Sequence, residues 1–214
     1  MTYSLSDLVG QPLNWHAAPR NHCELIAPDN SVLATLETSS PYWTSAKAVI
    51  PSGTPFPEGT FFLYLEENRA GFLGRMRWLF IVITAVEYSE GGQIIPLAAY
   101  KSDWPVGYGG ELRFPDGHMH RWGVASFWGK EKVWEDSPFD KTPYINFSAK
   151  TFDSRVVINP KAAEIPDELS LLLVLGHFNI LWEYWHALKV RTETSIRPHH
   201  WDVISNLFNI PLPR

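Results

Sequence analysis

The chain has only one cysteine among its 214 residues. One cysteine cannot form an intramolecular disulfide, so the fold is not a disulfide-stapled scaffold. The first seven residues also lack a basic segment followed by an apolar one, which is the pattern of a secretory signal. These two absences lead us to expect a cytoplasmic protein.

An excess of positive charge is missing as well. Lys and Arg total 18 against 23 Asp and Glu, which gives a formal net charge of −5. A general grip on nucleic acid needs a clustered basic surface, so no nucleic-acid partner is expected. No uninterrupted apolar run reaches the roughly 20 residues that a membrane-spanning helix needs, so no transmembrane span is expected either.

The common sequence signatures of catalysis are absent too. The chain holds no Gly-x-Ser-x-Gly elbow, no Walker loop and no His-Glu-x-x-His helix. Asp136 and Asp140 could act as a pair of carboxylates, but a solvated acidic turn is the simpler interpretation. We therefore predict no enzyme activity, no catalytic residue and no cofactor.

Apolar and aromatic residues, by contrast, are plentiful. Hydrophobic residues make up 45% of the chain and aromatic residues 14%, with ten Trp. A chain of this length and composition can bury a sizeable core in one domain. The many Trp indicate either rings packed against a sheet or a surface that exposes them to a partner.

Short segments rich in β-branched and aromatic residues recur along the chain. The clearest hairpin joins residues 111–114 to 119–124 across Pro115-Asp116-Gly117. A second hairpin pairs residues 23–26 with 32–36. Further strands are expected at residues 61–65, 78–88, 94–100, 132–134, 144–149 and 155–158. This spacing predicts an all-β sandwich or barrel.

The pattern changes at Pro166, where a proline and two acidic residues mark the start of a helix over residues 166–189. Its apolar side chains cover nearly every side, so it must be surrounded by protein or lipid, and it is too short for lipid. We expect His177 and Asn179 within it to satisfy polar groups of the surrounding wall. We expect four of its apolar side chains in the core: Leu172, Val174, Leu175 and Phe178.

Several stretches of the chain share one resemblance. They are Val32-Leu33-Ala34-Thr35-Leu36 with Ser45-Ala46-Lys47-Ala48, Gly71-Phe72-Leu73-Gly74-Arg75, Leu112-Arg113-Phe114-Pro115-Asp116-Gly117 with His120-Arg121-Trp122, and Val156 to Ala163 followed by Ile165 to Leu169. On these residues, the region 22–188 resembles the superfamily of tubby C-terminal domains, phospholipid scramblases and plant LURP-one-related proteins. The resemblance implies a mainly β, closed antiparallel barrel of about twelve strands that encloses a central hydrophobic C-terminal helix.

This resemblance also sets the expected organisation of the chain. Residues 1–20 have little periodicity and are expected as a lead-in. Residues 21–190 would form the tubby-like barrel with its helix at 166–189. Residues 191–214 would form a C-terminal tail with a short helix near 199–208.

The resemblance implies binding rather than catalysis. Tubby domains bind phosphoinositides, and the scramblases are lipid-linked and bind calcium. The chain lacks a cysteine-rich palmitoylation segment and an acidic loop of EF-hand type, so a scramblase-like role is not expected. The implied function is a non-catalytic domain that binds a phospholipid headgroup or another anionic ligand, which would place it in the cytoplasm or at the membrane periphery.

Two basic pairs are the candidate ligand-binding residues. Arg75 and Arg77 flank one residue on a predicted strand, as do Lys130 and Lys132, so each pair faces one way. Such pairs clamp a phosphate when the fold brings them together, and Trp128 could shoulder a headgroup. The alternative is that they are strand-edge charges that discourage aggregation.

The histidines give weaker signals. His118 and His120 alternate along the predicted hairpin and share a face, which is the arrangement of two metal ligands, but no third ligand is apparent nearby in the sequence. His16, His22 and Cys23 could form a soft-ligand cluster, although a lone Cys is more often a small buried apolar residue. We therefore predict no metal site.

Two other functions remain open from the sequence. A lipocalin-like carrier, or an enzyme acting on a small ligand, would keep an open barrel lumen with the helix outside. A protein-interaction module would use exposed Trp to bind another protein. The position of the helix separates the first of these from the tubby-like arrangement, and the sequence indicates no oligomeric state.

Overall fold

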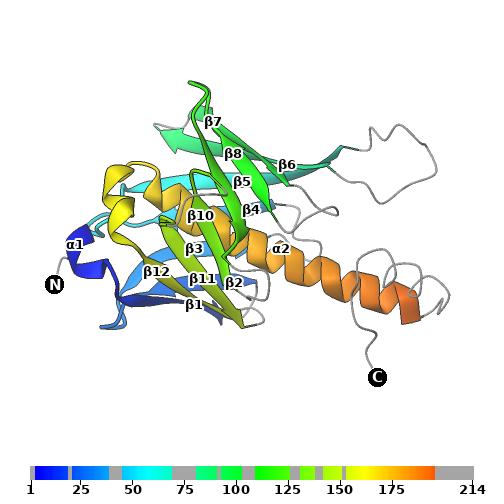
Figure 1. Cartoon of the computed structure of the whole chain (residues 1–214), viewed down its shortest axis with the longest axis horizontal. Coiled ribbons are helices and arrows are strands. Elements are labelled where there is room, and N and C mark those ends of the chain that lie inside the picture. Colours follow the sequence, from blue (N-terminus) through cyan, green and yellow to red (C-terminus); the bar gives the residue numbers. More distant parts are fainter. Residues whose placement is uncertain are drawn as a thin grey trace.

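The computed structural model describes residues 3–18, 21–38, 45–68, 81–90, 93–102, 109–125, 131–137, 142–150 and 153–195. In this part of the chain, a run of β-strands is followed by one long helix (Figure 1). The mainly β class and the helix that follows the strands are therefore confirmed.

The strands alternate along most of the chain with short connections. In order they are β1 (Pro12–Ala18), β2 (His22–Ile26), β3 (Val32–Thr38), β4 (Ser45–Ile50), β5 (Gly59–Asn68), β6 (Ile81–Glu90), β7 (Gln93–Ser102), β8 (Gly110–Arg113), β9 (Met119–Val124), β10 (Glu131–Glu135), β11 (Ile145–Lys150) and β12 (Asp153–Ile158). Before them comes the one-turn helix α1 (Leu5–Leu8), and after them come the 3-10 helix η1 (Pro160–Glu164) and the helix α2 (Leu169–Ser195).

Every strand pairs antiparallel with its neighbours in the sequence, which makes one large antiparallel sheet. β1 pairs with β2 on one side and with β12 on the other, where Trp15 lies opposite Leu25 and Ser154 respectively. The hydrogen-bonded strand order therefore returns to its start. Since both sides of β1 are paired, this strand presents no free edge to another chain.

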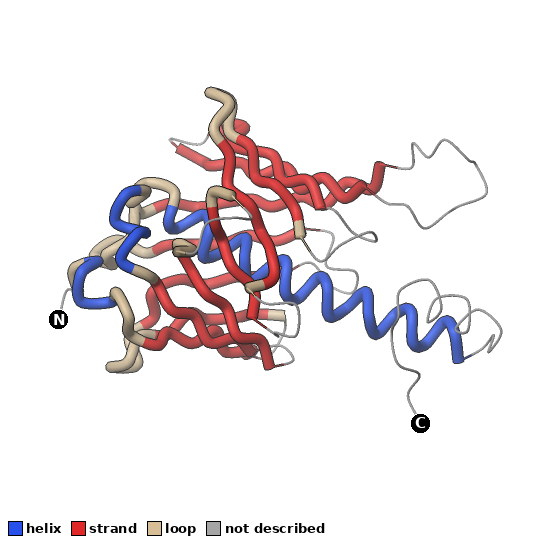
Figure 2. The backbone as a smooth tube through the Cα atoms, viewed as in Figure 1, coloured by secondary structure: helices blue, strands red, loops and turns tan. Residues whose placement is uncertain are grey.

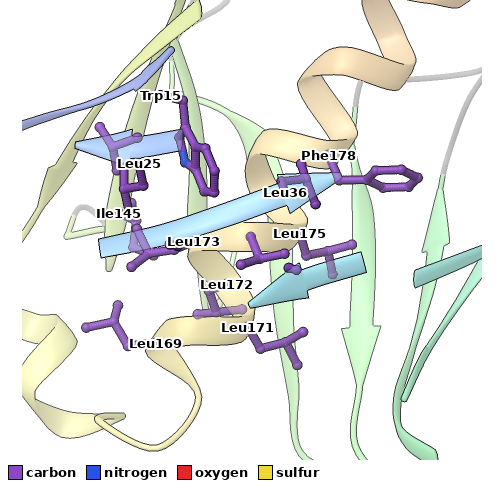
Figure 3. Packing of buried hydrophobic residues seen from close by; sticks show 14 of the residues in the cluster. Trp15, Leu25, Leu36, Ile145, Leu169, Leu171, Leu172, Leu173, Leu175 and Phe178 are labelled. Carbon is purple, nitrogen blue, oxygen red and sulfur yellow. The ribbon is translucent and has the colours of Figure 1, made fainter. Parts of the chain in front are cut away.

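The helix α2 begins among the strands, and its second half projects beyond them (Figure 2). The helix contacts the paired strands β10 and β11 and also β4, which lies far from them in the strand order. Leu172, Val174, Leu175 and Phe178 are all 0% exposed, as the apolar pattern on every face predicts. Figure 3 shows the leucines and Phe178 of this helix among side chains of the strands.

At Gly176, α2 lies close to the side chains of the strands. A Cβ added there would lie 2.5 Å from the ring of Phe147 on β11 and 2.9 Å from Nε1 of Trp134 on β10. The indole of Trp134 donates a hydrogen bond to the carbonyl of Leu172 at 2.8 Å, so the ring is fixed against the helix. The glycine in this Leu-rich run therefore makes room for the two rings.

The N-terminal region differs from the expected lead-in. Residues 12–18 form β1, and Leu13 and Trp15 are fully buried on its inner face. Pro, Asn, His and Ala in this segment are poor indicators of a strand, so the pattern did not reveal it. Pairing on both sides with β2 and β12 supplies the stability that local propensity lacks.

The helix bounds also differ from the prediction. Residues 166–168 form a turn, and α2 runs from Leu169 to Ser195 instead of ending at residue 189. The short helix expected near 199–208 lies outside the described residues. Among the described residues, no helix combines the length and the apolarity needed to cross a membrane.

Candidate metal centre

The connection between β8 and β9 carries the two histidines that the sequence singled out. Gly117 has φ of +93°, which few residues other than glycine adopt, and it turns the chain sharply. The N–H of Phe114 donates to the carbonyl of His118 at 3.0 Å, which closes the hairpin. His118 therefore stands directly before β9 and His120 within it, on the same face of the strand.

Both imidazoles point at the same carboxylate. Nε2 of His118 lies 2.9 Å from Oε1 of Glu168, and Nε2 of His120 contacts Oε2 of Glu168. One ligand atom from each residue lies within 4.8 Å of the others. These three residues are the only such metal-ligand group in the described part of the chain. We call them the His-His-Glu cluster.

Glu168 comes to the histidines from a distant segment. It is the last residue before α2, and its carbonyl accepts a hydrogen bond from the N–H of Leu172 at 3.0 Å. Its own N–H donates to the carbonyl of Ile165 at 3.2 Å. The turn after η1 thus holds the Glu168 side chain over the end of the β8–β9 hairpin.

A second carboxylate faces the far nitrogen of each ring. Nδ1 of His118 lies 2.5 Å from Oδ1 of Asp116, and Nδ1 of His120 lies 3.5 Å from Oδ1 of Asp136. Metal-bound histidines commonly donate their other ring N–H to a carboxylate, which fixes the tautomer and the ring orientation. Each imidazole here has this arrangement, with Glu168 on its Nε2 side.

Hydrogen bonds from other elements hold Asp136 in place. Its Oδ1 accepts from the hydroxyl of Tyr144 at 2.6 Å, and Lys161 Nζ lies 2.9 Å from its Oδ2. Burial works against ionisation of Asp136, but these two hydrogen bonds outweigh it and lower the pKa of the carboxyl. Burial and the adjacent Asp136 in turn raise the pKa of Tyr144. Asp136 is therefore a fixed anion beside His120.

Aromatic contacts hold the imidazole rings. Phe114 stacks on His118 with ring centroids 4.2 Å apart, and its edge faces His120 at 5.9 Å. The ring of Tyr144 lies edge-on to His120 at 5.3 Å. The side chain of His120 is 3% exposed, whereas that of His118 is 40% exposed. The cluster is thus closed on the His120 side and open to solvent on the His118 side.

The structure describes only Lys132 among the predicted anion-binding residues. Arg75, Arg77, Lys130 and Trp128 lie outside the described residues. The Lys132 side chain is only 13% exposed, and its ammonium lies 2.7 Å from Oε2 of Glu183 on α2.

Glu183 also accepts a hydrogen bond from the indole of Trp122 at 3.3 Å. Burial raises the pKa of Glu183, although Lys132 and Trp122 oppose this effect. We call Lys132, Glu183 and Trp122 the Lys-Glu pair. Lys132 therefore joins β10 to α2 and does not present its charge at the surface.

The structure also places the residues of the alternative soft-ligand cluster, His22 and Cys23. His22 lies between two carboxylates, with Nε2 3.2 Å from Glu24 and Nδ1 3.7 Å from Glu37. Cys23 follows His22 on the strand and therefore faces the opposite side, into the core. Burial raises the pKa of the Cys23 thiol to about 11, so the sulfur is not a thiolate at neutral pH.

A buried serine and a buried histidine contact each other, as two members of a catalytic triad do. Oγ of Ser154 lies 2.9 Å from Nδ1 of His177, and both side chains are buried. Burial lowers the pKa of His177 to about 3, so the ring is neutral. Its Nε2 has no hydrogen-bond partner in the described part of the chain, and the ring stacks on Trp15 at 4.5 Å. The contact lacks the orienting carboxylate of a triad.

The sequence had indicated two of the three residues of the His-His-Glu cluster and missed the third. Glu168 is 48 residues from His120 in the sequence and was interpreted as an acid at the helix start. The third residue therefore reaches the histidines from a distant part of the chain, where the sequence did not indicate it. No local pattern in the sequence links Glu168 to the histidines, because 48 residues separate it from His120.

Comparison of the chain with protein-family models, curated protein sequences and solved structures gave no match, so the assignment of this site rests on its geometry.

Proposed function

We propose that the protein binds a divalent transition-metal ion through Nε2 of His118, Nε2 of His120 and the carboxylate of Glu168. One observation carries the proposal: each imidazole has a carboxylate at both of its nitrogens. A neutral imidazole has one N–H and can donate to only one of them. An ion on the Nε2 side lets each ring keep its proton on Nδ1, facing Asp116 or Asp136.

The charges of the site support the same ion. Three carboxylates (Asp116, Asp136 and Glu168) surround two histidines, and among the described residues the ammonium in contact with these carboxylates is that of Lys161. With neutral histidines, these groups carry two net negative charges, which one divalent cation balances. Unbalanced charge is costly where side chains are partly buried, so the cation stabilises the arrangement.

The donor set selects the class of metal. Two imidazole nitrogens and one carboxylate suit Zn²⁺ and neighbouring first-row ions, whereas Ca²⁺ and Mg²⁺ prefer oxygen ligands. The ligand atoms all lie within 4.8 Å of one another, and small side-chain movements would bring them to the separation of about 3.4 Å that bonds of about 2.0–2.2 Å require in a tetrahedral site. We therefore propose a site for Zn²⁺ or Co²⁺ that Mg²⁺ does not fill.

The ion would join two elements of the fold. His118 and His120 belong to the β8–β9 hairpin, and Glu168 belongs to the start of α2, so the ion would join the sheet to its helix. An ion that binds only the folded chain stabilises it by about 2.7 kcal/mol when its free concentration is about 100 times the Kd.

Metal titration of the chelator-treated protein tests the proposal. We expect one Zn²⁺ per chain by elemental analysis, a rise in Tm on adding ZnCl2, and no rise with MgCl2. Glu168→Gln and His118→Gln should each abolish the rise while leaving a folded protein, because both side chains are partly exposed.

His16→Gln is the matched control, since it removes an exposed histidine far from the cluster in the sequence. A Zn²⁺-dependent rise in Tm that is equal in Glu168→Gln and the unmodified chain would contradict the proposal.

We propose the tubby-like architecture as the finer description of the fold. It is supported by twelve strands in antiparallel order, by the pairing of β1 with both β2 and β12, and by the apolar helix after them. The anionic-ligand function associated with that superfamily would need Arg75, Arg77 and Lys130, because Lys132 is engaged by Glu183. Binding of liposomes by an Arg75→Glu, Arg77→Glu double variant tests that function separately.

A further inference from the structure

The His-His-Glu cluster supplies three protein ligands, which is fewer than the common transition metals require. Zn²⁺ takes four ligands in structural sites, and sites with three protein ligands complete the sphere with water or substrate. Among the described residues, no fourth His, Cys, Asp or Glu joins the group. One position of the ion's coordination sphere is therefore left to a molecule from solution.

The two nearest additional carboxylates are placed where they cannot fill this position. Asp116 and Asp136 face Nδ1 of His118 and His120, whereas the ion would bind the Nε2 atoms. The two nitrogens lie on different edges of the imidazole ring, so a group that hydrogen-bonds one is separated by the ring from a metal on the other. These carboxylates therefore orient the rings and remain outside the coordination sphere.

Solvent reaches the cluster from one side. The His118 side chain is 40% exposed and that of Glu168 is 23% exposed, whereas that of His120 is 3% exposed. His120 thus closes the inner side and carries the contacts with Tyr144 and Asp136. A small molecule can approach the ion from the His118 and Glu168 side.

From these three observations we infer that the bound ion keeps an exchangeable coordination position that accepts a small carboxylate anion, with water there when the anion is absent. This inference rests on the proposed metal-binding function. Because Glu168 is the one anionic ligand of the three, the ion and its protein ligands carry one positive charge, which a monoanion at the open position neutralises. Asp116, Asp136 and Lys161 lie outside this coordination sphere and together add one negative charge. Asp116 is 69% exposed, so solvent weakens its repulsion of such an anion.

The experiment uses the full chain loaded with Co²⁺, whose visible absorption reports the number and type of its ligands. Sodium acetate is titrated into the Co²⁺ protein, and sodium perchlorate at equal ionic strength serves as the weakly coordinating control. We expect a saturable change in the visible bands with acetate and none with perchlorate. The Glu168→Gln variant should show neither Co²⁺ binding nor an acetate response.

The possible results separate the two proposals. If Co²⁺ does not bind the unmodified chain, the metal-binding function fails, and the exchangeable position fails with it. If Co²⁺ binds but its spectrum is the same in acetate and perchlorate, the metal-binding function holds and the exchangeable position is overturned. A fourth protein ligand from outside the described residues would give this second result.

Discussion

Two polar clusters lie at opposite ends of the buried half of α2, and they differ in how completely their charges are matched. Glu168 stands before the first residue of the helix, and Glu183 lies fifteen residues further on, which is about 22 Å of helix. The Lys-Glu pair sets one ammonium against one carboxylate, with a hydrogen bond from Trp122. Around the His-His-Glu cluster, one ammonium (Lys161) and two histidines face three carboxylates (Asp116, Asp136 and Glu168) among the described residues.

The difference indicates which cluster is complete on its own. A buried charge needs a partner of opposite sign, and Glu183 has one in Lys132. At the Glu168 end, one ammonium faces three carboxylates, and protonated histidines or a bound cation would complete the balance. We therefore interpret the Lys-Glu pair as part of the scaffold and the His-His-Glu cluster as a binding site. Between the two clusters, the helix is held by apolar packing.

The largest effect on stability should come from the apolar segment between the clusters. Phe178 is fully buried on α2, and Phe178→Ala removes its contacts and leaves a cavity. We expect a loss of about 3–5 kcal/mol in the free energy of unfolding, measured by urea denaturation. Val32→Ala, at a side chain that is 38% exposed, is the control and should change it by no more than about 0.5 kcal/mol. Similar losses in the two variants would show that α2 is not the core.

Gly176→Ala should also destabilise the protein, although alanine is the better helix former. The added methyl would overlap Phe147 and Trp134, which are fully buried and have little room to shift. We expect a loss of about 1–3 kcal/mol from this overpacking, against a gain of about 1 kcal/mol from helix propensity. Thermal unfolding gives the sign, and a higher Tm in the variant would mean that the helix is packed less closely than the structure indicates.

Acid should weaken the apolar segment through His177. Burial lowers the pKa of this side chain from 6.5 to about 3, so between these values the unfolded chain binds a proton that the folded chain does not. Its contribution to stability is therefore complete above pH 6.5 and declines as the pH falls toward 3, by at most about 1.4 kcal/mol per pH unit.

His177→Phe keeps a ring against Trp15 and removes the titration. Urea denaturation of both proteins across this range should show a shallower decline of stability with acid in the variant. Equal slopes would mean that His177 binds a proton as readily in the folded chain as in the unfolded chain.

The smallest effect on the fold, with a clear effect on the site, is expected for Asp116→Asn. Asp116 is exposed and contacts only His118 among the residues of the His-His-Glu cluster, so unfolding of the metal-free protein should change by no more than about 0.5 kcal/mol. Loss of a carboxylate behind a metal-bound histidine should weaken Zn²⁺ binding by about 10–100-fold. Competition titration with a Zn²⁺ indicator measures this change, and an unchanged affinity would remove Asp116 from the site.

The sequence by itself determined the elements that carry strong local patterns. Alternation and turn residues located the β2–β3 and β8–β9 hairpins, because Asn30 and Gly117 supply the positive φ that their turns need. Apolar side chains on every face of the segment after Pro166 required surrounding protein, and the structure buries that segment among the strands.

Tertiary structure alone decided the strand β1 and the composition of the site. Residues 12–18 carry no strong strand signal, and pairing with β2 and β12 holds them as a strand. The N–H of Ala17 on β1 donates to Oδ1 of Asp153 on β12, which is 136 residues further along the chain. Glu168 likewise meets His118 and His120 only because α2 enters the sheet at the end where the β8–β9 hairpin turns. Contacts between residues so distant in the chain depend on the packing of the helix start against the sheet, and no local pattern of residues encodes them.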